Sequence, residues 1–199
     1  MKFKLLFTFA AFVTLSFQVS AQESANEITA LNWIRNHATD FKTKATDVFK
    51  LTFVYKSLAG ETLRFQQMMN DVPVYQSEIV INFNLSNEVA FTSDSYKSTI
   101  TSIPTIPAIS KETAEEKSLE HLKIQGGYTV AENNLYVTQV NDATKLVYRV
   151  VTNPANGNGS WEVLIDAQNG NVISTKDVAI YYHKKEHPTK KSKPKPRKK

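Results

Sequence analysis

The chain has 199 residues and no cysteine, which excludes a disulfide framework, a thiolate metal site and a lipid anchor attached to cysteine. Its hydrophobic content of 41% and aromatic content of 11% are typical of a globular protein and exclude a wholly disordered chain. The formal charge of +5 misleads, because residues 184–199 hold nine of the 24 basic residues and one of the 19 acidic ones. Residues 22–183 hold 13 basic and 18 acidic residues, so we expect no nucleic-acid partner.

Residues 1–21 have the pattern of a secretory signal peptide. Lys2 and Lys4 precede an apolar stretch at 5–17, which is shorter than a typical membrane span. Small residues lead up to an expected cleavage between Ala21 and Gln22. We therefore expect an exported protein, secreted or periplasmic, with no membrane span after removal of the signal.

The first expected elements are a helix and a strand. Apolar residues at helical spacing predict a helix over 25–37, and Ser24 and Glu27 are spaced as a capping box. Alternating apolar residues then predict a strand over 48–56, and a reversal at Ala59-Gly60 follows it.

Residues 63–83 read as two strands joined by a tight turn, and the rest of the chain is organised around them. Asn70-Asp71 reverses the chain, and Pro73, which lacks an N–H group, belongs at the start of a strand or on an edge. The apolar residues expected on one face of the second strand are Tyr75, Ile79, Ile81 and Phe83. With a further strand over 88–92, the first half is a helix followed by a four-stranded antiparallel meander.

This hairpin resembles the FTP propeptide motif, which fungalysin-like and thermolysin-like zinc metallopeptidases carry ahead of their catalytic domain. The residues that carry the resemblance are Arg64, Phe65, Gln66, Gln67, Val72, Pro73 and Val74. The family usually has Gly before Val-Pro-Val, whereas Asp71 stands there in this chain. Because Asp tolerates a positive φ better than most residues, the turn can still form.

The second half repeats the order of a helix followed by strands. Two prolines within 101–107 indicate an extended linker, and Ser110 is placed to cap a helix that runs to about residue 123. Strands are expected over 135–140, 146–151, 161–166 and 172–174, with turns at 141–144 and at Asn169-Gly170. We therefore predict an α+β fold of two small subdomains, each a helix packed on an antiparallel sheet.

The second half resembles the PepSY-like region that follows the FTP motif in the same proregions. The resemblance rests on residues 146–150, 161–167 and 170–172, which include Trp161 and Asp166, and it is closer to the fungalysin-like branch. Together, the composition and the two resemblances divide the chain into signal peptide 1–21, FTP-like subdomain 22–100, linker 101–109, PepSY-like subdomain 110–180 and disordered basic tail 181–199. The zinc peptidase domain that should come next in such a precursor is absent from this chain.

No set of residues forms a recognisable catalytic site. His183, Glu186 and His187 spell the H-x-x-E-H pattern of some zinc peptidases, but they lie in a lysine-rich segment directly before Pro188, where no apolar stripe could hold a helix. His37 and His121 fall at helix ends, where a solvated imidazole is the ordinary interpretation. We expect no catalytic residue, no metal, no cofactor and no enzymatic activity.

The polar motif residues have two interpretations that the sequence leaves open. Arg64, Gln66 and Gln67 either fix the register of neighbouring strands or contact a peptidase surface. Asp166 is more typical of a turn-forming residue than of a ligand.

Two functions from different classes follow. The resemblance implies a secreted proregion, zymogen-like in action, that serves as chaperone and inhibitor of a zinc metallopeptidase catalytic domain, in cis or in trans. The alternative is a secreted, non-enzymatic protein that binds a surface or an anionic polymer through its basic tail.

Overall fold

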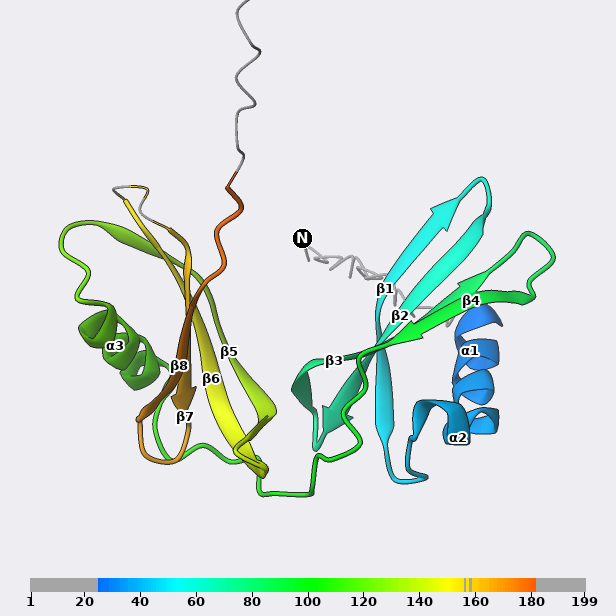
Figure 1. The fold of residues 1–199 in the computed structure, drawn as a ribbon, viewed down its shortest axis with the longest axis horizontal. Coiled ribbons are helices and arrows are strands. Elements are labelled where there is room, and N and C mark those ends of the chain that lie inside the picture. The colour runs from blue at the N-terminus through cyan, green and yellow to red at the C-terminus, as the bar shows by residue number, and fades with distance from the viewer. Residues whose placement is uncertain (1–24, 156, 158, 182–199) are drawn as a thin grey trace, which may run out of the picture.

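The computed structural model describes residues 25–155, 157 and 159–181, so the expected signal cleavage site, the basic tail and the H-x-x-E-H pattern lie outside the described residues. In this part the chain is a mixed α/β protein in which one large sheet dominates and helices are few (Figure 1). None of these helices is both long and apolar enough to cross a membrane. The elements are α1 (Ala25–Asn36), α2 (Ala38–Phe41), β1 (Val48–Ser57), β2 (Gly60–Met69), β3 (Val72–Phe83), β4 (Val89–Asp94), α3 (Lys111–Leu122), β5 (Tyr128–Val140), β6 (Ala143–Pro154), β7 (Trp161–Asp166) and β8 (Val172–Asp177).

The N-terminal half, residues 25–100, is the predicted helix and meander. Strands β1, β2, β3 and β4 pair antiparallel in chain order. Helix α1 covers one face, where Ile34 shares a buried cluster with Phe65 and Ile81. The short helix α2 was not predicted, and it ends at Lys42, whose φ of 59° is left-handed.

Two turns of this half depend on particular residues. Asn70 and Asp71 both have positive φ, 46° and 64°, which is the conformation that a two-residue hairpin loop requires. Gly60 has a φ of 140°, and a Cβ there would lie 1.9 Å from the Phe83 carbonyl oxygen. Both predicted reversals are therefore confirmed, the second because only glycine fits.

Strand β3 changes direction within the sheet at a bulge around Gln76, whose φ is 53°. While β2 advances from Gln66 to Met68, the partner residue on β3 moves from Glu78 to Pro73. The extra residues break the period-two alternation, because a bulge leaves them unpaired. Tyr75 therefore does not share the buried face of Ile79, as the sequence pattern predicted, and it lies among polar groups instead.

The C-terminal half, residues 108–178, is built in the same way. The Ser110 hydroxyl accepts a hydrogen bond from the Thr113 amide at 3.2 Å, which confirms the predicted cap of α3. Strands β5, β6, β7 and β8 pair antiparallel, and their apolar face packs with Ala114 of α3. The turn at 141–142 again uses two residues with positive φ.

Strand β3 joins the two halves. Val74 pairs in parallel with Val137 of β5 and belongs to the buried cluster of the C-terminal half, not to that of its own half. All strands therefore form one connected sheet, and this arrangement does not confirm a division into two subdomains. In Figure 1 the helices lie at the outer ends of the molecule with the strands between them, so the helix-free sheet faces point inward.

Candidate functional site

The structure places three of the motif residues inside the protein. Phe65 and Val74 are fully buried, and Gln67 is 4% exposed. Phe65 belongs to the core of the N-terminal half and Val74 to that of the C-terminal half. Their role in the folded protein is to hold its interior together.

The two motif glutamines hold the bulge of β3. The Gln66 side-chain amide donates to the carbonyl oxygens of Val74 at 2.7 Å and Ser77 at 2.8 Å, on either side of Gln76. The Gln67 oxygen accepts from the buried Ser77 hydroxyl at 2.5 Å. These bonds satisfy backbone groups that the bulge removes from the ladder. They support the fold-specifying interpretation of both glutamines.

Arg64 lies on the opposite face of the sheet from α1, in contact with solvent. Its side chain is 49% exposed, and its guanidinium lies 3.4 Å from the Glu78 carboxylate and 5.8 Å from the centroid of the Phe53 ring. An exposed ion pair of this kind contributes little to stability. Arg64 is therefore free to serve a partner as well as its neighbours.

The remaining predicted residues are half-buried or buried. Val72, Pro73 and Trp161 are half-buried, whereas Asp166 is 4% exposed. The Asp166 carboxylate accepts from Lys145 Nζ at 2.7 Å and from the Gln168 amide at 2.9 Å. Burial alone would raise the pKa of Asp166, but these hydrogen bonds outweigh it and lower the pKa. The bond to Gln168 is the expected turn-forming contact.

An ionic network that the sequence analysis missed lies where the halves meet. Arg149 of β6 bonds to two carboxylates, with its Nε 2.6 Å from Glu162 and one NH group in a very short contact with Glu132. Tyr75 of β3 donates to the other oxygen of Glu162 at 2.6 Å, and Tyr136 donates to Glu132 at 2.9 Å. A residue of the N-terminal half is thus bonded to a buried carboxylate of the C-terminal half.

The network shifts the acidities of its members. Burial and the hydrogen bond to Glu162 raise the pKa of Tyr75 to about 12, and burial with Glu132 raises the pKa of Tyr136 to about 12. Burial works to lower the pKa of Arg149, but Glu132 and Glu162 outweigh it and raise that pKa, so the guanidinium stays charged. At neutral pH the network therefore holds two protonated phenols and a charged guanidinium.

A pocket of about 550 Å³ opens beside this network, and we call it the junction pocket. It is lined by Gln66, Tyr75, Gln76, Glu78, Ser95, Tyr136 and Arg149, which come from both halves. The Tyr75 and Tyr136 rings meet edge to face with centroids 5.7 Å apart. Tyrosine and arginine are enriched in protein interfaces, so the chemistry of this pocket suits recognition of a polar protein surface.

The two described histidines have structural partners. His37 Nδ1 lies 2.9 Å from the Trp33 carbonyl oxygen and its ring stacks on Trp33, while His121 Nε2 lies 2.8 Å from the Thr175 hydroxyl. Within the described ranges, no three His, Asp or Glu side chains gather in a way that could hold a metal ion.

Comparison with known proteins identifies one domain. Residues 108–176 match the family model of PepSY, the peptidase propeptide and YPEB domain, so the chain contains a PepSY domain. No curated protein matches the chain.

Two solved structures are similar to this chain at low identity. The Bacillus megaterium YpeB C-terminal domain is 16% identical with a TM-score of 0.40, and the similarity covers 80% of this chain and 66% of that one, just under two thirds of its length. A Clostridium difficile 630 protein, described as a candidate lipoprotein, is 13% identical with a TM-score of 0.30, over 74% of this chain and 91% of that one. Neither similarity is high enough to transfer a function.

Proposed function

We propose that this protein is an exported, non-enzymatic, propeptide-like module that binds the catalytic domain of a zinc metallopeptidase, in cis or in trans. In this role it inhibits the enzyme and assists its folding. The observation that carries the proposal is the PepSY match over residues 108–176. The FTP-like residues of β2 and β3 support it, because they precede this domain in the chain and pack into its core through Val74.

We further propose that residues 22–100 and 110–180 act as two subdomains, FTP-like and PepSY-like. The buried apolar residues fall into two separate clusters, one under α1 and one under α3, which supports this division. The bulge that Gln66 holds sets the angle between them, because β3 enters one cluster before Gln76 and the other after it.

The proposed binding surface is the helix-free face of the N-terminal half together with the junction pocket. Phe53, Tyr55 and Phe91 pair with residues on the Arg64 side of the sheet, and each is more than half exposed. Aromatic side chains around an arginine are the usual composition of the central part of an interface. The surface would act by shape and charge complementarity.

The ionic network prepares this surface for binding. Because Tyr75, Arg149 and Glu162 are already bonded to one another, the junction pocket loses little conformational freedom when a partner binds. A rigid template of this kind suits a module that must hold one conformation of its partner.

The experiment is a titration of the purified protein against two mature enzymes, a thermolysin-type and a fungalysin-type zinc peptidase, with peptide hydrolysis as the readout. We expect stoichiometric inhibition of at least one enzyme. The variant Glu78→Lys reverses a charge beside the junction pocket and should weaken inhibition about tenfold or more. The control Glu116→Lys makes the same change on the exposed side of α3 and should leave inhibition unchanged.

Inhibition of neither enzyme, together with salt-sensitive binding to dextran sulfate that disappears on deletion of 184–199, would favour the polymer-binding alternative. That alternative rests on the nine basic residues in that segment. Equal effects of the two charge reversals would show that the binding surface has been misplaced.

A further inference from the structure

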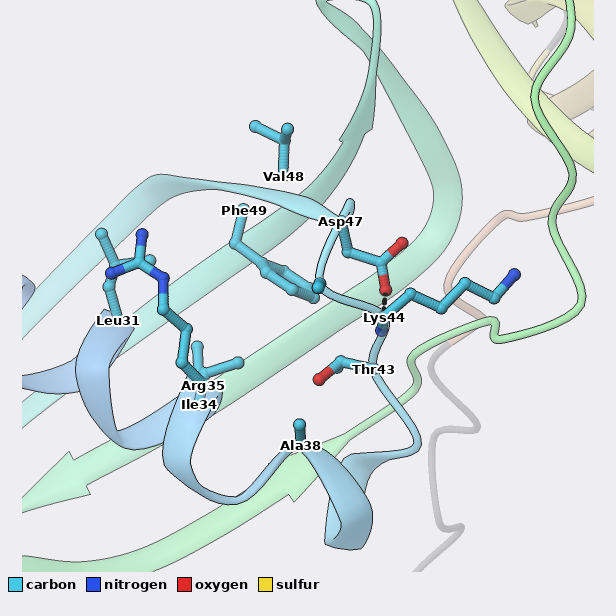
Figure 2. A pocket seen from close by; sticks show the side chains of 10 residues that line it. Leu31, Ile34, Arg35, Ala38, Thr43, Lys44, Asp47, Val48 and Phe49 are labelled. Carbon is cyan, nitrogen blue, oxygen red and sulfur yellow. Dashed lines mark hydrogen bonds between the residues drawn. The ribbon is translucent and has the colours of Figure 1, made fainter.

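A second hollow lies on the α1 side of the sheet, away from the junction pocket. This groove has a volume of about 410 Å³ and is lined by Leu31, Ile34, Arg35, Ala38, Thr43, Lys44, Ala45, Asp47, Val48 and Phe49. Figure 2 shows side chains of α1 on one side and of the first residues of β1 on the other. We call it the α1–β1 groove, and it is independent of the proposed function.

Most of the lining of the groove is apolar. Ile34 is buried at its base, and Leu31 and Phe49 are half-buried, whereas Val48 at the rim is 59% exposed. The volume falls within the roughly 300–1,000 Å³ that is typical of small-molecule sites. An apolar group that entered would cover surface now in contact with water.

The charged groups around the groove are not equivalent. Asp47 is occupied, because its carboxylate accepts from the Lys44 amide at 2.6 Å and from the Tyr96 hydroxyl. The Lys44 ammonium donates to the Ile100 carbonyl at 3.2 Å, and Figure 2 shows it directed away from the apolar side chains.

Arg35 is the charge that remains. Figure 2 shows its side chain lying beside Leu31 and Ile34. Its guanidinium donates to the neutral Asn32 side-chain oxygen at 3.2 Å, and no carboxylate of the described residues lies within 4 Å of it. A guanidinium beside an apolar groove matches a ligand that has an apolar body and one carboxylate, which arginine can bind through two parallel hydrogen bonds.

We propose that the α1–β1 groove binds an amphiphilic monocarboxylate, with its apolar part against Ile34 and Phe49 and its carboxylate on Arg35. The occupant is a free medium-chain fatty acid rather than the C-terminus of a polypeptide, because the mostly apolar lining would leave the amide groups of a peptide backbone without hydrogen-bond partners.

The test is calorimetry on the purified protein with four probes. Sodium decanoate, below its micelle concentration, is compared with decanol, and an acetylated hexapeptide ending in Phe is compared with its C-terminal amide. Decanoate should bind at least about tenfold more tightly than decanol, since the alcohol lacks the charge-assisted hydrogen bond to Arg35. Tighter binding of the hexapeptide carboxylate than of decanoate would overturn the fatty acid as the occupant.

Variants assign the site. Arg35→Gln should reduce binding of the carboxylate about tenfold and leave the uncharged probe unchanged, whereas Arg35→Lys should retain part of the difference. Ala45→Phe, at an exposed lining position, should reduce binding of both members of a pair by filling the groove. Lys50→Gln removes a charge of the same sign from a residue of β1 that does not line the groove and lies on the face opposite to Phe49, and it should change nothing.

Absence of decanoate binding would overturn the proposal. So would equal binding of charged and uncharged probes, or an Arg35→Gln effect no larger than that of Lys50→Gln. Retained thermal unfolding of each variant shows that a loss of binding is not a loss of fold.

Discussion

In the N-terminal half, the sheet face turned away from α1 carries exposed aromatic residues and the ion pair of Arg64 and Glu78, whose side chains are 49% and 32% exposed. In the C-terminal half, the face turned away from α3 carries buried carboxylates, Glu162 and Asp166, each bonded to a cation. Each half packs one 12-residue helix, α1 or α3, on an antiparallel sheet of four strands. The two halves differ in the side chains on the sheet face that is turned away from the helix, which we call the second face.

If the proposed binding surface is correct, this difference separates a face that contributes to stability, in the C-terminal half, from a face that contributes to recognition, in the N-terminal half. A buried ion pair costs much to break, because the remaining partner is left charged without solvent, whereas an exposed pair costs little. The C-terminal half should therefore tolerate few changes on its second face. In the N-terminal half, many substitutions on the corresponding face should leave the free energy of unfolding nearly unchanged and weaken partner binding instead.

The largest effect should come from the core of the N-terminal half. Phe65→Ala removes a fully buried ring and should lower the free energy of unfolding by about 4 kcal/mol. If the halves are subdomains, hydrogen exchange of this variant should quicken in β1–β4 and remain slow in β6 and β7. Equal loss of protection in all strands would show a single cooperative unit.

The next effect contrasts the two second faces directly. Glu162→Ala leaves Arg149 with one carboxylate and Tyr75 without its acceptor, and should lower the free energy of unfolding by about 3 kcal/mol. The matched change Glu78→Ala should cost less than about 1 kcal/mol, because that pair is exposed to solvent. Urea denaturation gives the free energy of unfolding of both variants. Similar losses for the two would contradict the proposed difference between the faces.

A smaller effect is expected at the bulge that joins the halves. Gln67→Ala removes the acceptor of the buried Ser77 hydroxyl and should cost about 2 kcal/mol. Gln76→Gly is the control, because glycine adopts the positive φ of this exposed residue without strain and should leave stability equal or higher. Denaturation midpoints of the two variants test this expectation. A greater loss of stability for Gln76→Gly than for Gln67→Ala would mean that Gln76, and not the bond between Gln67 and Ser77, stabilises the bulge.

The smallest effect concerns acid stability. Because the pKa of Asp166 is lowered in the folded protein, its contribution is present above the ordinary pKa of 3.8 and is lost as the pH falls through the folded value. The stability difference between the protein and Asp166→Asn should be constant above about pH 5 and shrink below pH 4. Lys145 is 38% exposed, so solvent screening keeps this effect modest. A difference that grows on acidification would contradict the assignment.

Much of the fold follows from residues that act locally. The alternation in β2 placed Leu63 and Phe65 inside, and Ser110 marked the beginning of α3. Turns at 70–71 and 141–142 use Asn and Asp, which accept positive φ more readily than most residues. These features depend on a few neighbouring residues, so a sequence pattern is enough to find them.

The junction could not be found in this way. Glutamine has no special preference for positive φ, so nothing in the residue type announced the bulge at Gln76. The bond between Tyr75 and Glu162 joins residues 87 positions apart and depends on the parallel contact of β3 with β5. One signal was present: Glu132, Arg149 and Glu162 alternate in sign on three successive strands, at positions facing away from the helix. Charges so placed between apolar neighbours predict a cross-strand network.

The most direct test of the proposed binding surface is hydroxyl-radical footprinting of the protein alone and in complex with a zinc peptidase that the titration shows it to inhibit. We predict that Phe53, Tyr55, Phe91 and Tyr136 become protected in the complex. Ile28 on α1, which is 52% exposed, serves as the internal control and should react equally in both states. Protection of Ile28 with unchanged reactivity of the four aromatic residues would contradict the account, because the partner would then bind the helix side of the sheet.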